Sequence, residues 1–120
     1  MTPEHIVFVS SQGWLRLAQG QAREIQPWPT LQGPTLVVVD FAEAQVGVQF
    51  CKGKPAYAAA QIEKVVRAEG LIDGAVQVLV HKQVGHADSN QTLYTAVPLP
   101  QWQELQSWAA RQSDHCMVIP

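Results

Sequence analysis

The stretch that decides the fold is residues 44–97, AQVGVQFCKGKPAYAAAQIEKVVRAEGLIDGAVQVLVHKQVGHADSNQTLYTAV. Apolar residues occupy every second position at its start, namely Ala44, Val46, Val48 and Phe50. A period of two places alternate side chains on one face and predicts a β-strand. Residues 76–82 and 92–97 alternate in the same way. Residues 57–69, between these segments, have helical spacing, so the stretch predicts strand, helix, strand, strand.

The helix of this stretch is well delimited in the sequence. Pro55 fits a first helical turn, where its missing N–H costs nothing, and Gly70 is suited to end a helix in the left-handed conformation. One side of the helix carries the apolar residues Ala58, Ala59, Ile62, Val65 and Val66. The polar, glycine-containing residues 83–90 predict an exposed loop between the two following strands.

The residues that flank this stretch predict further strands and a second helix. His5–Ser10 and residues 14–19 and 21–26 are separated by glycine turns, which favour an antiparallel meander. The apolar run at residues 36–40 predicts a strand covered on both faces. Residues 101–111 follow two prolines and predict a helix, and Cys116–Ile119 predicts a last strand. The fold class predicted is therefore α/β, an α+β arrangement with a mixed sheet.

Composition narrows the classes of function. The chain has 120 residues, 47% of them hydrophobic and 15% charged, with a net charge of -2. We therefore expect one domain over residues 1–120, with no basic surface for nucleic acid. No apolar run is long enough for membrane insertion, and no signal peptide is recognisable, so we expect a cytoplasmic protein. The last strand ends at Pro120, which suggests the N-terminal lobe of a longer chain.

Histidines and an acidic residue in the predicted loop are the candidate metal ligands. His81, His86 and Asp88 lie close in sequence, and residues 114–116 (Asp-His-Cys) could join them if the fold brings the two segments together. Structural zinc sites usually show paired, closely spaced ligands, which this pattern lacks. We therefore predict a solvated loop and no metal.

The two cysteines define an alternative function, a small Cys/His-dependent enzyme. Cys51 or Cys116 could form a nucleophilic pair with His81, because such pairs are adjacent in space and not in sequence. No glycine-framed nucleophile turn supports this pair, and two buried, reduced thiols are the simpler interpretation. A ribonuclease H type of metal nuclease needs a carboxylate in the first strand, and His5–Ser10 has none.

The four tryptophans divide into two groups. Trp102 and Trp108 have helical spacing and are expected in the core. Trp14 and Trp28 flank turns, so an exposed one of the two is the candidate interface residue, since aromatic anchors dominate binding hot spots. The edge strand of the meander could also accept a peptide strand.

Two passages carry a resemblance to a known family. Residues 93–98 (LYTAVP) lead directly into the helix with Trp102 and Leu105, and residues 59–74 (AAQIEKVVRAEGLIDG) form the preceding helix and its exit. These passages, and their order, resemble the PilM-like and GspL-like proteins, actin-like assembly proteins of type IV pili and type II secretion. The resemblance implies a ribonuclease H-like or actin-like lobe with a strand–helix–strand–strand segment.

The chain departs from the ATP-binding members of this family at one turn. Those members carry Asp-x-Gly-Ser/Thr after the first strand, whose backbone N–H groups hold phosphate. Here Ser10, Ser11 and Gly13 form a degenerate version of the turn, and Trp14 replaces a small hydroxyl residue. Nucleotide hydrolysis is therefore not expected, and no cofactor is expected.

What the resemblance then implies is a non-catalytic cytoplasmic scaffold that docks other assembly proteins of a pilus or secretion system. It would lie at the inner face of the inner membrane through its partners or through a further C-terminal region. A nucleotide-responsive, actin-like ATPase fragment is the other alternative that the resemblance leaves open.

Overall fold

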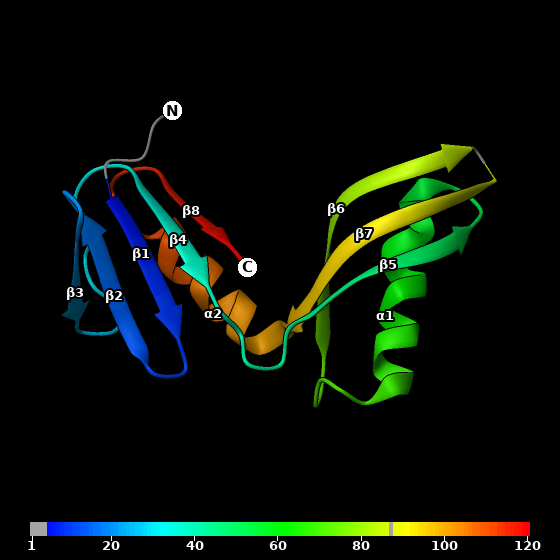
Figure 1. Cartoon of the computed structure of the whole chain (residues 1–120), viewed down its shortest axis with the longest axis horizontal. Coiled ribbons are helices and arrows are strands. Elements are labelled where there is room, and N and C mark those ends of the chain that lie inside the picture. The colour runs from blue at the N-terminus through cyan, green and yellow to red at the C-terminus, as the bar shows by residue number, and fades with distance from the viewer. Residues whose placement is uncertain (1–4, 87) are drawn as a thin grey trace. The chain divides into compact units, whose positions relative to one another are not determined.

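The structure is a computed structural model that describes residues 5–86 and 88–120 (Figure 1). Contacts within the chain define two compact units. The first combines Met1–Ala42 with Gln103–Pro120, and the second is Glu43–Trp102. That the 120 residues act as one domain stays a prediction.

The elements follow the order expected from the sequence. The strands are β1 (His5–Ser10), β2 (Gly13–Ala18), β3 (Gln21–Ile25), β4 (Thr35–Val39), β5 (Gln45–Lys52), β6 (Val76–His86), β7 (Ser89–Pro98) and β8 (Cys116–Ile119). The helices are the 3-10 turn η1 (Pro55–Tyr57), α1 (Ala58–Glu69) and α2 (Leu99–Ala110).

The first unit is built on a mixed five-stranded sheet in the order β3-β2-β1-β4-β8. β1, β2 and β3 pair antiparallel, so the predicted meander is confirmed. β4 pairs parallel with β1 on one side and with β8 on the other. The predicted α/β class with a mixed sheet is therefore confirmed.

One face of this sheet forms the core of the first unit. Val7 and Val37 are fully buried on it, and Trp14 lies on the same face. α2 supplies Leu105 and Trp108 to the buried set. These side chains recur at helical spacing on α2, which explains why a short helix can cover the sheet.

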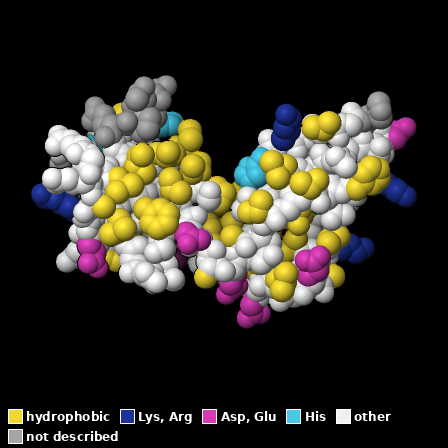
Figure 2. Space-filling view, in the orientation of Figure 1, with side chains coloured by type: hydrophobic (Ala, Val, Ile, Leu, Met, Phe, Trp, Pro, Cys, Tyr) yellow, Lys and Arg dark blue, Asp and Glu magenta, His cyan; other side chains and the backbone are white. Residues whose placement is uncertain are grey.

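The opposite face is less covered than the sequence suggested. Leu36 and Val38 of β4 are only half-buried, so the prediction that this strand is covered on both faces is wrong for the second face. Around them, five aliphatic side chains each expose more than a third of their surface: Ile6, Leu15, Leu17, Met117 and Ile119. Figure 2 shows apolar side chains gathered over these strands. An unbroken apolar run fits both a doubly covered strand and an apolar face left open, so the sequence could not distinguish them.

The second unit is a three-stranded antiparallel sheet, β5-β7-β6, with α1 on one face. Its core joins Ile62 and Val66 of α1 to Cys51, Val78 and Ala96 of the strands. The predicted strand–helix–strand–strand segment is therefore confirmed. Gly70 ends α1 with a φ of 69°, and its N–H donates to the carbonyls of Val66 and Arg67.

The alternation of β5 is confirmed, but its apolar side is the exposed one. Val46, Val48 and Phe50 expose 73%, 63% and 56% of their surfaces. The side towards α1 carries Cys51, which is fully buried, and Gln49, which is half-buried. The second unit thus presents an apolar strand face to its surroundings.

The hairpin of β6 and β7 corrects the prediction of a long exposed loop at residues 83–90. The strands continue to His86 and resume at Ser89, so most of these residues are paired. Asn90 is buried, and its side-chain oxygen accepts hydrogen bonds from Thr92 and Gln83. Gln83 of β6 also donates to Oγ1 of Thr92 on β7, so polar side chains bond across the ladder, a pairing between separate strands that local polarity does not reveal. The register shifts by one residue between Val80 and Lys82, which marks a β-bulge in β6.

Gly85 is the glycine that this hairpin requires. Its φ is 147°, and a Cβ there would lie 2.5 Å from the carbonyl oxygen of Ser89. We expect Gly85→Ala to lower the free energy of unfolding by about 3 kcal/mol, because backbone strain and the clash add. Gly74→Ala is the control, since Gly74 has a φ of 84° and open space around it; its expected loss is about 1 kcal/mol. Urea denaturation measures both, and equal losses would contradict the proposed clash.

Candidate functional site

The degenerate turn lies between β1 and β2. Ser10 and Gly13 face each other across the hairpin, and the N–H of Gln12 donates to Oγ of Ser10 at 3.2 Å. This bond occupies one of the amide groups that a phosphate-holding turn would present. Ser11 is exposed and bears only a hydroxyl. The assignment of Ser10, Ser11 and Gly13 as a former phosphate turn stays a prediction.

Asp40 is a residue near this turn that sequence reasoning did not select. Its N–H donates to the carbonyl of Val9 at 2.8 Å, which places it beside the end of β1. β1 and β4 are parallel, and ligands of open α/β sheets bind at the carboxyl ends of such strands. The signal available in the sequence was an acidic residue directly after the apolar run. One exposed carboxylate supplies less than the pair that a catalytic metal ion usually requires.

The interface candidates Trp14 and Trp28 belong to one aromatic cluster. The ring centroid of Trp14 lies 5.0 Å from that of Trp28 and 5.1 Å from that of Trp108. Trp14 is 6% exposed, so it is a core residue, and Trp28, at 43%, remains the surface candidate of the two. Trp28 has a φ of 59°, an unusual conformation for a bulky residue.

Trp108, on α2, is the third member of this cluster. Its ring packs edge-on against Trp14, and its Nε1–H donates to the carbonyl of Pro29 at 3.0 Å. Trp108 is buried, as predicted for a core residue, whereas Trp102 is only half-buried.

The thiols do not have the setting of catalytic cysteines. Cys51 is fully buried on the α1 side of its sheet, and its Sγ lies 3.8 Å from the carbonyl oxygen of Gln49. Nε2 of His81 lies 2.7 Å from Oγ1 of Thr95, a residue on the opposite face of the sheet from Cys51. The structure therefore does not bring Cys51 and His81 together. Burial raises the pKa of Cys116, which disfavours the reactive thiolate.

The candidate metal ligands are not gathered within the part of the chain that the structure describes. No group of three or more His, Cys, Asp or Glu side chains occurs there. The side chain of His86 lies outside the described residues. Asp114 has a structural role, because its Oδ2 accepts the N–H of Gly33 at 2.8 Å. The prediction of no metal stays a prediction.

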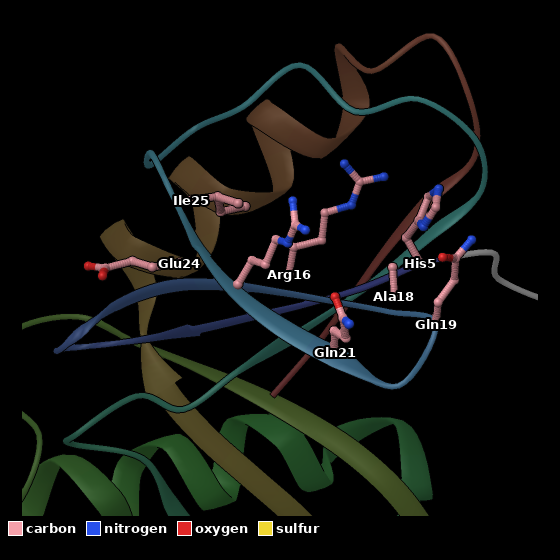
Figure 3. Close-up of a pocket in the computed structure, with 8 residues that line it drawn as sticks. His5, Arg16, Ala18, Gln19, Gln21, Glu24 and Ile25 are labelled. Carbon is pink, nitrogen blue, oxygen red and sulfur yellow. The ribbon is translucent and has the colours of Figure 1, made fainter.

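A hollow of about 550 Å³ lies over β2 and β3 of the first unit (Figure 3). Its lining is mainly polar and comprises His5, Arg16, Ala18, Gln19, Gln21, Arg23, Glu24 and Ile25. Arg16 and Arg23 are direct cross-strand partners, and Glu24 points away from Arg16 in Figure 3. The exposed guanidinium groups can attract an anion, but both are solvated, so their attraction is weak.

Comparison with solved structures shows what the fold of this chain is similar to. No protein-family model and no curated protein matches the chain. A solved structure that matches is the cytoplasmic domain of EpsL, an inner membrane component of the type II secretion system of Vibrio cholerae. The TM-score is 0.53 and the sequence identity 15%, over 97% of this chain and 56% of that one.

The chain thus spans a little over half the length of that structure and shares its fold. The likeness agrees with the GspL-like side of the resemblance, whereas the PilM-like side stays a prediction. Among the described residues, no helix is long and apolar enough to cross a membrane.

The two thiols should differ sharply in reactivity. In the native protein we expect Cys116 to be alkylated more slowly than an unfolded thiol, because its pKa is raised and it holds its proton to higher pH. Cys51 should react only on unfolding, since it is fully buried. Alkylation rates from pH 7 to 10, followed by mass spectrometry, measure this. Cys116→Ser should abolish the native reaction and Cys51→Ala should leave it. If the alkylation rate of Cys116 in the native protein reached half its maximum at a lower pH than in the unfolded protein, the result would contradict this prediction and favour a catalytic thiol.

Proposed function

We propose that this chain is a non-catalytic protein-interaction domain of a type II secretion or pilus assembly system. The observation that carries the proposal is the fold that it shares with the cytoplasmic domain of EpsL, an inner membrane component of such a system. The partners would be other assembly proteins. The site of action would be the cytoplasmic face of the inner membrane.

The arrangement of elements supports the finer part of this proposal, an actin-like or ribonuclease H-like lobe. The chain opens with a hydrogen-bonded meander of three strands. It then inserts β5, α1, β6 and β7 as a compact unit. β7 ends at Pro98 and α2 begins at the next residue, which is the strand–proline–helix passage of the resemblance.

The chemistry of the candidate sites supports a function without catalysis. The turn after β1 offers hydroxyls instead of a carboxylate, and Ser10 Oγ accepts a bond from the turn itself. Cys51 is buried away from His81, and burial raises the pKa of Cys116. Exposed apolar side chains on both sheets are, in contrast, features of surfaces that contact other proteins. The net charge of -2 gives no basis for binding nucleic acid.

Nucleotide binding is the first test of this proposal. Titration of the purified chain with ATP and Mg²⁺ should give no binding heat, and phosphate release should not exceed the protein-free blank. The physical reason is that the turn after β1 carries no carboxylate, and the single carboxylate of Asp40 is less than the pair that usually holds a catalytic metal ion. Saturable binding with turnover would contradict the scaffold and favour the ATPase alternative.

Trp28 tests the docking function directly. Binding of the chain to the cytoplasmic parts of assembly proteins encoded beside it should weaken about tenfold in Trp28→Ala, because exposed aromatic anchors dominate interfaces. Tyr57→Ala is the matched control, since Tyr57 is an exposed aromatic residue of the other unit. Biolayer interferometry measures both affinities. Equal affinities for both variants and the unaltered chain would remove Trp28 from the interface.

A further inference from the structure

β5 is an edge strand of unusual composition. It pairs with β7 on one side, and within the described residues no strand pairs with its other side (Figure 1). Val46, Val48 and Phe50 are its most exposed side chains. Proteins usually protect an exposed edge with charges, proline or a bulge, and residues 46–50 contain none of these.

The hydrogen bonds show which backbone groups of β5 are open. The N–H of Gly53 donates to the carbonyl of Asp88, so the odd-numbered residues of this register point towards β7. The N–H and C=O of Lys52 instead bond to the side-chain amide of Gln61. The even-numbered residues therefore point to the free edge. At that edge the backbone N–H and C=O groups of Val46 and Val48 are open. The C=O of Phe50 accepts one hydrogen bond, from the side-chain Nε2 of the neighbouring Gln49 at 3.3 Å.

The open N–H and C=O groups of one β5 strand can pair with those of a second copy, with Val48 at the centre of the pair. In an antiparallel pair centred there, Val48 faces Val48 of a second copy, and Val46 faces Phe50. Each of these pairs would exchange two hydrogen bonds, because the even-numbered residues present both N–H and C=O to the edge. Directly opposed side chains lie on the same face, so the two apolar rows would adjoin.

The charges that flank β5 select the same direction of pairing. Glu43 lies in the turn before β5, where its Oε2 accepts the N–H of Asp73 at 3.4 Å, and Lys52 and Lys54 lie at the other end of the strand. The antiparallel register brings the acidic end of one copy to the basic end of the other. The two-fold symmetry repeats this attraction at the other end of the pair. A parallel pair would instead place lysines beside lysines, which is unfavourable.

We propose that two copies of this chain associate by antiparallel pairing of their β5 strands, centred on Val48. The two three-stranded sheets then form one sheet of six strands. Gln61 remains on Lys52 and limits the new ladder to residues 46–50. This dimer does not depend on the proposed function in secretion.

Sedimentation equilibrium of the full chain tests the proposal. A concentration-dependent dimer is expected, and Val48→Lys should raise its dissociation constant at least tenfold, because two lysines would face each other. Val84→Lys is the matched control, an equally exposed valine on β6 at the opposite edge of the sheet, and it should leave the constant unchanged. A chain that is monomeric at every concentration, or a dimer insensitive to Val48→Lys, would overturn the proposal.

Charge reversal tests the register. Glu43→Lys, and separately Lys52→Glu with Lys54→Glu, should each weaken the dimer, and the three changes together should restore it. A dimer that is not restored would overturn the antiparallel register.

Crosslinking avoids reliance on destabilising variants. Val48→Cys should form an intermolecular disulfide on mild oxidation, since hydrogen-bonded antiparallel partners have Cα atoms about 5.5 Å apart. Val84→Cys should not. Equal crosslinking of both variants would overturn the proposal. So would a monomer whose Val46 and Val48 amides become protected from exchange only when an assembly partner is added, since the partner would then supply the strand.

Discussion

The hydrogen bond from the indole of Trp108 to the carbonyl of Pro29 is the contact on which the first unit depends. It holds α2 to the irregular residues 26–34, which connect β3 to β4 without a helix. Two further side chains act on the same connection, because Gln112 accepts the N–H of Leu31 and Asp114 that of Gly33. The C-terminal part of the chain thus supplies the polar partners that this loop cannot provide for itself.

The same contact orders the aromatic cluster and decides which tryptophan can meet a partner. Trp108 packs edge-on against both Trp14 and Trp28, and Trp14 is buried between the sheet and the helix. Trp28 then lies at the surface in a left-handed backbone conformation, held on one side by buried rings. A rigid, half-exposed aromatic ring loses little conformational freedom on binding, which suits a docking function.

Much of the element order could be predicted from the sequence, because it depends on local periodicity and on turn residues. Which face of a strand is buried could not be predicted. The alternation predicted for β5 is correct, yet Val46 and Val48 are exposed and Cys51 is buried. The extent of the β6–β7 hairpin also escaped prediction, since Gln83 of β6 reaches Asn90 and Thr92 of β7 only when the two strands pair. The tryptophan cluster unites residues 14, 28 and 108, a contact between distant segments that spacing cannot reveal.

The β-bulge in β6 has a consequence for the size of any assembly made through the second unit. A sheet with two regular edges can accept strands at both ends and extend into a fibre. Here the register shift between Val80 and Lys82 interrupts the spacing of donors and acceptors along β6 and puts a lysine there. Within the described part of this sheet, β5 is the regular edge, so two copies joined through β5 leave a bulged β6 at both ends of the combined sheet. The geometry permits a finite complex and opposes amyloid-like polymerisation.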